Sequence, residues 1–228
     1  MVELVDKGLV KKPDLLVLDE SDRLMGHQFT RHMVILADAF SGSKTVLFSV
    51  QLPKALLEKA ERVLKKKFDS AKAGVVSGNT IKHWAVISSK PQVKLAEMIR
   101  ENPAVSIVFC ATTREVNEVA RLLKSYGLHP LAFHAAKGAK RRHNAVRRFK
   151  HGETLLVSTD LAARGVHFQG VKRIYSLGLP PNPHFYIHRA GRTGRMHESG
   201  ECVTIILEHD IKKMKNIYDS LGIECVIA

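Results

Sequence analysis

The segment from Tyr186 to Arg195, YIHRAGRTGR, carries three arginines at three-residue spacing with two glycines between them. It follows Asn182-Pro183, residue types that are typical of the cap and first turn of a helix. Each glycine weakens a helix by about 1 kcal/mol, so we expect the chain to leave helical geometry and present Arg192 and Arg195 from a tight backbone. Guanidinium groups held in this way suit a phosphate chain, because each can donate two parallel hydrogen bonds. The alternative is a basic surface loop.

The segment LLVLDESD, residues 15–22, is an apolar strand that delivers two carboxylates at its carboxyl end. Open α/β sheets bind their ligands at that edge. Asp19 can hold magnesium through the water molecules of the ion, and Glu20 can orient and deprotonate a water that attacks a γ-phosphate. The alternative is that Asp19, Ser21 and Asp22 only cap the helix that follows, and this string alone does not decide between the two interpretations.

A third string, residues 155–167, again runs from an apolar strand into polar residues. We interpret Asp160 as the cap of a short helix that Gly165 can end. Thr159 and Arg164 are the functional candidates here.

These strings need strands to position them, and the sequence after residue 78 alternates short apolar runs with amphipathic segments. Two of the helices have capping signals at their starts, Thr112 with Glu115 and Ser89 with Gln92. Strands regularly separated by helices predict an α/β fold, a mostly parallel sheet with helices on both faces. The six expected strands are Trp84–Ser88, Ser106–Phe109, Leu131–His134, Thr154–Ser158, Arg173–Leu177 and Cys202–Leu207.

Residues 1–77 supply only three strand candidates, so we expect them to form half a domain. Helices near Met25–Phe40 and Pro53–Lys67 can cover the faces of a small sheet, but at least one long apolar edge lacks a neighbour, and proteins rarely leave such an edge bare. The predicted organisation is a partial unit at 1–77, a hinge at 78–80 and a complete α/β domain at 81–228. The three strand candidates are Leu15–Asp19, Thr45–Val50 and Gly74–Val76.

Composition places the chain among folded intracellular proteins with a polyanionic partner. It has 228 residues, 45% of them hydrophobic, and a formal charge of +14. Residues 1–77 hold 13 basic and 10 acidic residues and residues 78–228 hold 23 and 12, so most of the positive excess lies in the second part. The excess suggests a polyanionic partner such as nucleic acid, and the alternatives are a solubility feature and attraction to anionic lipid. No apolar run is long enough to span a bilayer, and three scattered cysteines favour reduced thiols.

Together the three strings resemble motifs II, V and VI of the DEAD-box RNA helicases of superfamily 2. Two further strings fit the resemblance: Phe48–Pro53 stands at the place of the family's Ser-Ala-Thr motif, and Ile107–Thr112 looks like motif IV. The resemblance implies two RecA-like lobes that bind ATP, Mg²⁺ and RNA across a cleft and couple hydrolysis to RNA strand separation. The chain would hold the carboxyl-terminal part of the first lobe and the whole second lobe.

The resemblance also implies roles for individual residues. In the family these positions converge on one triphosphate and transmit its state to lobe closure. The catalytic set would be Asp19, with its magnesium, Glu20, Arg192 and Arg195. The coupling set would be Asp22, Ser49, Arg164, His188 and Arg189.

The stretch Lys137–His151 has seven Lys or Arg and no acid. A solvated basic face is one interpretation, but in the family this position touches RNA phosphates. We therefore expect backbone contacts with weak sequence preference from Arg142 and Thr159, with Lys140 and Arg141 in support.

Several features depart from the family pattern. There is no Gly-x-x-x-x-Gly-Lys-Ser/Thr phosphate loop, and Gly42–Thr45 only imitates its end, since it leads into a strand instead of following one. Val50-Gln51 replaces Ala-Thr, Ala139 replaces an RNA-contacting Gln, and His167 replaces an Asp near the ribose. Because nothing cradles the β- and γ-phosphates, the chain alone is expected not to turn over ATP.

Three hypotheses follow. The first is an ATP-dependent RNA helicase, for RNA unwinding or ribonucleoprotein remodelling, whose first lobe is completed by a missing amino-terminal segment or a protein partner. The second is a non-catalytic, helicase-derived RNA-binding scaffold of a ribonucleoprotein, for example in ribosome assembly. The third, a DNA-directed superfamily 2 motor, is disfavoured by the DEAD-like carboxylate string.

Overall fold

The computed structural model describes residues 2–49, 53–71, 81–163, 166, 168–194 and 198–227. The chain forms two compact units, Met1–Val76 and Ser77–Ala228. None of the helices in the described ranges is both long enough and apolar enough to cross a membrane. Several predictions fall outside these ranges: the strand at 74–76, the hinge at 78–80, and the positions Val50, Gln51, Arg164, His167 and Arg195.

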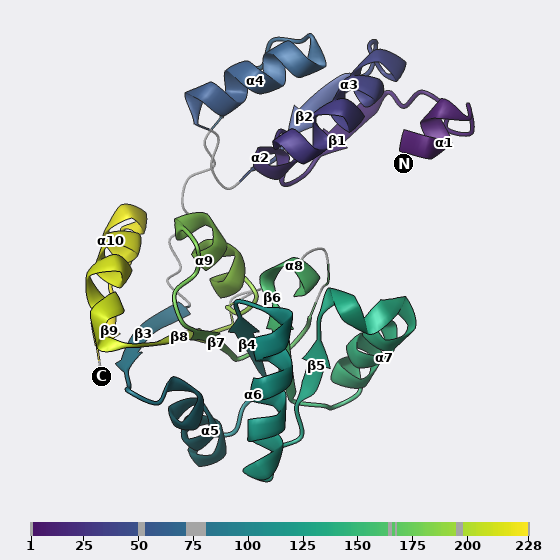
Figure 1. The fold of residues 1–228 in the computed structure, drawn as a ribbon. Coiled ribbons are helices and arrows are strands. Elements are labelled where there is room, and N and C mark those ends of the chain that lie inside the picture. Colours follow the sequence, from purple (N-terminus) through teal and green to yellow (C-terminus); the bar gives the residue numbers. More distant parts are fainter. Residues whose placement is uncertain are drawn as a thin grey trace. The chain divides into compact units, whose positions relative to one another are not determined.

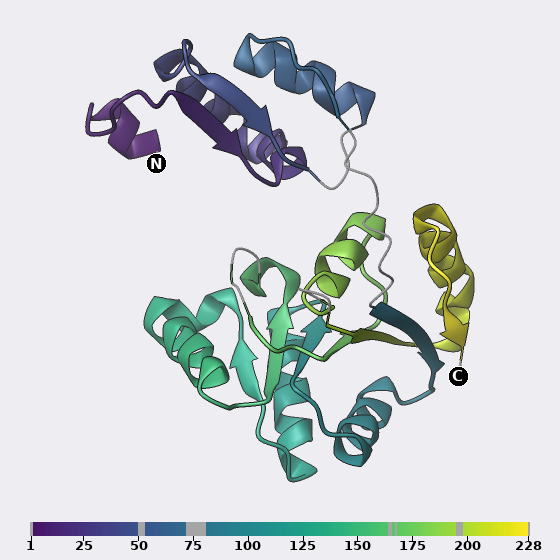
Figure 2. The same cartoon turned by 180° about the vertical axis from the view of Figure 1, so that it is seen from behind.

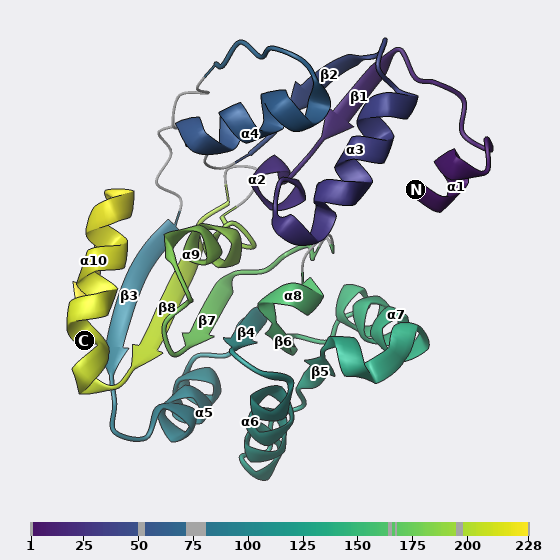
Figure 3. The ribbon, with the colours of Figure 1, turned by 45° about the horizontal axis from the view of Figure 1, so that its top comes forward.

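The first unit is a two-stranded parallel sheet with helices (Figure 3). Leu15 pairs with Lys44 and Leu18 with Leu47, so the two strands end side by side. Its elements are α1 (Val2–Asp6), β1 (Leu15–Leu18), α2 (Ser21–Leu24), the 3₁₀ turn η1 (His27–Phe29), α3 (Thr30–Ala39), β2 (Lys44–Leu47) and α4 (Lys54–Leu64).

The expected helix at Met25–Phe40 is shorter than predicted. Met25 closes α2, Gly26 is extended, and the long helix α3 begins only at Thr30. The apolar residues on both sides of Gly26 join one core, which explains why the sequence pattern reads as continuous across the break.

Among the described residues, one face of the small sheet is covered and the other is open. Leu16, Leu18 and Leu47 pack with buried side chains of α3 and α4. Side chains alternate between the faces of a strand, so their neighbours point to the opposite face. There the exposed fractions are 51% for Leu15, 50% for Val17, 38% for Val46 and 56% for Phe48, a contiguous apolar surface of the kind that is typical of an interface.

The second unit is a seven-stranded sheet in the order β5-β6-β4-β7-β8-β3-β9, and every described strand pair in it is parallel (Figure 1). The strands are β3 (Ile81–Ile87), β4 (Ser106–Cys110), β5 (Leu131–Phe133), β6 (Leu155–Thr159), β7 (Arg173–Leu177), β8 (Gly200–Ile206) and β9 (Val226–Ile227). The helices and turns are α5 (Pro91–Glu101), α6 (Thr113–Ser125), η2 (Ala135–Lys137), α7 (Gly138–Lys150), α8 (Asp160–Ala163), α9 (Pro183–Ala190), η3 (Glu208–Asp210) and α10 (Ile211–Leu221).

Helices cover both faces of this sheet, as Figure 2 shows from behind. On β4, Ile107 and Phe109 pack with α7, α9 and α10, whereas Val108 and Cys110 pack with α5 and α6. This alternation confirms the predicted α/β class, and all six predicted strands of this unit are present. β9, a two-residue strand that pairs with β3, was not predicted from the sequence.

The two predicted helix starts differ in outcome. Thr112 caps α6 as expected, because its hydroxyl accepts from the Glu115 backbone N–H at 3.1 Å. The prediction for Ser89 is wrong, since the cap of α5 is Lys90 and no side chain caps it. Pro91 lies in the first turn of α5 and has no backbone N–H. One fewer donor at the start of this helix therefore needs a side-chain acceptor.

Candidate functional site

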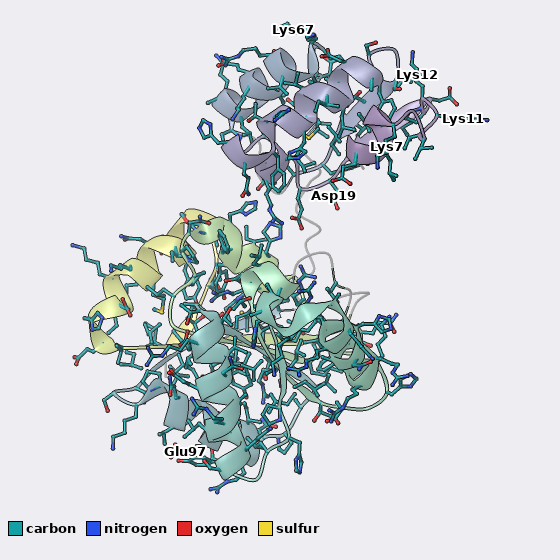
Figure 4. All side chains as sticks on the ribbon, turned by 45° about the vertical axis from the view of Figure 1, so that its right-hand side comes forward. Lys7, Lys11, Lys12, Asp19, Lys67 and Glu97 are labelled. Atoms are coloured by element: carbon teal, nitrogen blue, oxygen red, sulfur yellow. The ribbon has the colours of Figure 1, made fainter. Side chains whose placement is uncertain are left out.

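The carboxylates of the first unit follow directly on β1. Asp19 is exposed at the end of that strand, opposite to the end near Lys11 and Lys12 (Figure 4). Its Oδ1 accepts the Glu20 backbone N–H at 2.8 Å. Glu20 adopts the left-handed conformation with φ 50° and ψ 44°, which a residue with a β-carbon rarely takes. This turn ends the strand abruptly and leaves both acids at the carboxyl edge of the sheet.

Backbone hydrogen bonds join the chain just after β2 to this turn. The Ser21 N–H donates to the Phe48 carbonyl and the Phe48 N–H to the Leu18 carbonyl, both at 2.9 Å. The Ser49 hydroxyl then donates to Asp22 Oδ1 at 3.0 Å. The structure therefore brings Asp22 and Ser49, two residues that the sequence places 27 positions apart, into direct contact.

The donor set of this edge fits a hydrated divalent cation. Asp19 is an exposed carboxylate at the carboxyl end of β1, and hard cations such as Mg²⁺ take oxygen ligands and retain several waters. Asp22 is already bonded to Ser49, so Asp19 is the residue of this turn that would hold the ion.

In the second unit the central contact is an ion pair between Arg189 of α9 and Asp160 of α8. Arg189 Nε donates to Asp160 Oδ1 and its Nη2 to Oδ2, both at 2.7 Å. The side chains are 2% and 15% exposed, and the guanidinium lies 5.5 Å from the centre of the Phe109 ring. Asp160 is the first helical residue of α8, and its two bonds to a buried arginine are a contact that the interpretation as a helix cap does not include.

A signal for this pair is present in the sequence. The buried residues of α9 are Tyr186, Arg189 and Ala190, which have the spacing of one helix face. An arginine on an apolar face needs a buried acid, and Asp160 at the end of an apolar strand is a suitable partner. Burial also raises the pKa of the neighbouring Cys110 thiol far above its ordinary value, so Cys110 stays neutral beside the pair.

The segment after α9 leaves helical geometry at the predicted place. Ala190 is the last helical residue and Gly191 is the C-cap. Arg192 Nη1 donates to the Val166 carbonyl at 2.8 Å, and the buried Thr193 hydroxyl donates to the Val171 carbonyl at 2.7 Å. These bonds fix the turn that carries Arg192.

The turn also approaches the start of β8 closely. A β-carbon built on Gly200 would lie only 2.7 Å from the Gly194 nitrogen, so this contact requires glycine on the strand. Gly194 itself has φ +65°, which favours glycine as well. Glycines on both sides of the contact thus let the arginine-bearing backbone pack tightly.

His188 lies one helical turn from His184, with 3.3 Å between their Nε2 atoms. Its role in coupling stays a prediction.

The proposed RNA residues lie around α7 and β6. Arg142 Nη1 donates to the Ala135 carbonyl at 2.8 Å, which holds its side chain against η2. Lys140 and Arg141 are exposed on α7. Thr159 is the last residue of β6 and is half-buried.

Comparisons with known proteins place this geometry in a family. Residues 90–197 match the helicase conserved C-terminal domain. The chain is 28% identical over 225 residues to the DEAD-box ATP-dependent RNA helicase CshA of Geobacillus kaustophilus, which covers 95% of this chain and 48% of that protein. The chain belongs to the DEAD-box RNA helicase family. A CshA of Bacillus cereus is 30% identical to this DEAD-box chain over 210 residues, covering 90% of it and 40% of the relative. Helicobacter pylori RhpA is 28% identical over 218 residues, 93% of this chain and 44% of that one.

Solved structures agree on the fold. S. cerevisiae Dbp5 bound to RNA and ADP BeF3 is similar with a TM-score of 0.86 at 22% identity, covering 100% of this DEAD-box chain and 63% of that one. The DEAD-box helicase Mss116 bound to ssRNA and UDP-BeF is similar with a TM-score of 0.83 at 25% identity. The match covers 100% of this chain and 51% of that one. The chain spans about half the length of the curated relatives it matches.

Proposed function

We propose that this chain is the motif II to motif VI portion of an ATP-dependent RNA helicase that unwinds RNA or remodels ribonucleoproteins. The observation that carries the proposal is the hydrogen bond from Ser49 to Asp22. It joins two strings that the family uses, and it holds them at the strand edge where Asp19 and Glu20 also lie.

Each unit contributes part of the chemistry. Asp19 would hold Mg²⁺ through water, and the ion would neutralise phosphate charge when bound. Glu20 would orient the attacking water and accept its proton, while Arg192 and Arg195 would donate to the phosphate oxygens as negative charge develops on them.

The coupling residues would act by holding the catalytic residues in place. The Asp22–Ser49 bond links the acidic turn to the neighbouring strand end, and the Arg189–Asp160 pair fixes α9, which leads into Arg192. Arg164 and His188 complete the proposed coupling set.

RNA would be held by its backbone. Arg142 would pair with a phosphate, and Lys140 and Arg141 would add positive potential on the same helix. Thr159 would add a hydroxyl contact from the end of β6. Phosphate contacts carry no sequence information, so sequence preference should be weak.

The first unit needs a completing segment. One face of its sheet exposes Leu15, Val17, Val46 and Phe48, and the chain spans about half of its relatives. We propose that a segment outside residues 1–228, or a separate protein, covers this face and supplies the phosphate loop.

The second candidate function is a non-catalytic RNA-binding scaffold within a ribonucleoprotein. The sequence favours it at specific points, since the chain has no phosphate loop and Val50-Gln51 and Ala139 replace family residues. The two candidates share RNA binding and differ in ATP hydrolysis.

RNA-stimulated ATP hydrolysis separates them. We expect residues 1–228 alone to hydrolyse ATP negligibly and the chain joined to the sequence upstream of Met1 in its gene to be active. Glu20→Gln in the longer protein should then lower kcat by at least about a hundredfold, because it removes the base that accepts the proton. Lys7→Gln, on the same unit but away from the acidic turn, is the control. Inactivity of both forms with RNA binding intact would establish the scaffold instead.

A further inference from the structure

A hollow of about 470 Å³ lies between α6 and α7 in the second unit. Figures 1 and 3 both show β5 between these two helices. The residues of β5 that line the hollow are Leu131 and Ala132, with Pro130 just before them. The hollow therefore runs beside the last strand of the sheet.

Its charge is of one sign. No acidic residue is among the described residues that line it. Asn117 and Asn144 add amide groups, one from each helix. The cations come from both walls: Arg121 and Lys124 from α6, and Lys137, Arg141 and Arg148 from η2 and α7.

Most of this charge is not neutralised inside the protein. Arg148 pairs with Glu153 at 2.6 Å, and Arg121 donates weakly to the Asn117 carbonyl at 3.4 Å. The side-chain nitrogens of Lys124, Lys137 and Arg141 form no hydrogen bond or ion pair within the described ranges of the chain. Three like charges held around one hollow raise its potential, and an anionic ligand would relieve their repulsion.

The floor of the hollow is a strand edge. Within the part of the chain that the structure describes, β5 is the terminal strand of the sheet and pairs with β6 alone. An unpaired edge offers backbone N–H and C=O groups to an added strand. Side chains of an added strand alternate in direction, so successive ones would point toward the α6 wall and the α7 wall.

We propose that this groove binds an extended acidic peptide segment of a protein partner, added to β5 as a strand with its carboxylates on the cations of both helices. An RNA backbone fits less well, because it matches the cations but not the strand edge, whose backbone N–H and C=O groups are spaced to pair with another strand. Of the proposed RNA residues on α7, Arg142 is bonded to the Ala135 carbonyl and, like Lys140, is absent from the lining, whereas Arg141 borders both surfaces. One helix thus carries two basic surfaces with different ligands.

Fluorescence polarisation with the full chain tests the proposal. The probe is a short labelled peptide in which the acidic pair Glu-Asp alternates with the neutral pair Val-Thr. The two residues of a pair point to opposite faces of a strand, so both faces carry acids. The groove variant Lys124→Glu/Lys137→Glu should weaken its binding by at least about tenfold, equivalent to about 1.4 kcal/mol. The matched control Arg100→Glu/Lys150→Glu reverses two exposed charges outside the lining and should bind within about twofold of the parent.

A second peptide separates strand addition from general charge attraction. Methylation of all its backbone nitrogens keeps every carboxylate but removes the N–H donors, so its binding should be lost. The proposal is wrong if the methylated peptide binds equally well or if the control variant weakens the acidic peptide as much as the groove variant does. It is also wrong if the groove variant loses a short oligouridylate but keeps the peptide, which would make the groove an RNA site. None of these outcomes depends on ATP hydrolysis.

Discussion

At the scale of single residues, the Arg189–Asp160 pair has the largest consequence for packing. A charge removed from water is costly unless it is paired, and here two hydrogen bonds of 2.7 Å compensate an arginine that is 2% exposed. Its Nη1 is buried and has no partner among the described residues. The pair therefore stabilises the unit mainly by keeping the guanidinium from being buried alone.

We expect Asp160→Ala to destabilise the second unit by about 3–5 kcal/mol, because it leaves Arg189 buried without a countercharge. Adding Arg189→Met should recover most of the loss, since an apolar side chain then fills the same space. Urea unfolding followed by the fluorescence of Trp84, the single tryptophan of the chain and a β3 residue, reports on this unit.

The control for this prediction is Glu153→Ala. It breaks the Arg148 pair, whose arginine side chain is 58% exposed, and should cost less than about 1 kcal/mol. Equal losses in Asp160→Ala and Glu153→Ala would show that burial does not set the energy of the pair.

Residue roles were harder to predict than residue positions. For Asp160 the sequence pattern predicted only a local helix cap, because local patterns favour neighbours and its partner lies 29 positions away. The same limit applies to Asp22 and Ser49, which meet only because β1 and β2 are adjacent and parallel.

At the scale of elements, α6 shows a helix start that the sequence encodes fully. The Thr112 hydroxyl accepts the Glu115 N–H, and the Glu115 carboxylate in turn accepts the Ala111 N–H at 2.8 Å. The reciprocal bond reaches one residue further back than the usual capping box, but it satisfies two backbone donors in the same way.

Thr112→Ala should therefore lower the free energy of unfolding by about 1 kcal/mol, because it removes the hydroxyl that accepts the Glu115 N–H at the start of α6. Thr113→Ala removes the same hydroxyl at the first helical position, where it is not the cap, and should be neutral within about 0.5 kcal/mol. Thermal and urea unfolding of both variants would measure the difference, and equal effects would contradict a capping role.

Element prediction succeeded where burial on both faces made strands uniformly apolar. β7 begins and ends at the predicted residues, and β4 extends one residue further than predicted. It failed where the pattern carried too little information. β9 has two residues, both exposed, and the break at Gly26 is hidden because the core accepts apolar side chains from both sides of it.

At the scale of the whole molecule, the chain combines a unit with an open apolar face and a unit with a strongly basic surface. Of the net charge of +14, the larger share lies in residues 78–228, and α7 carries no acid along its length. A charge excess of this kind favours polyanions in general, so the arrangement of cations must decide which anion each surface binds.

The salt dependence of RNA binding tests that assignment for Arg142. Each phosphate contact with single-stranded RNA contributes about −0.7 to the slope of log affinity against log salt. We expect Arg142→Ala to lower the affinity of the full chain for a short oligouridylate and to reduce the slope by about that amount. Polarisation titrations across a range of potassium chloride concentrations would measure both quantities.

Arg100→Ala is the matched control, because Arg100 is an exposed arginine on α5 in the same unit and lies outside both basic surfaces of α7. It changes the net charge by the same amount and should leave the slope unchanged. If both variants flatten the slope equally, RNA senses only the total charge of the unit, and the placement of a phosphate at Arg142 fails. If Arg142→Ala alone flattens it, the backbone contact belongs to the η2 end of α7, where the Ala135 carbonyl holds the guanidinium.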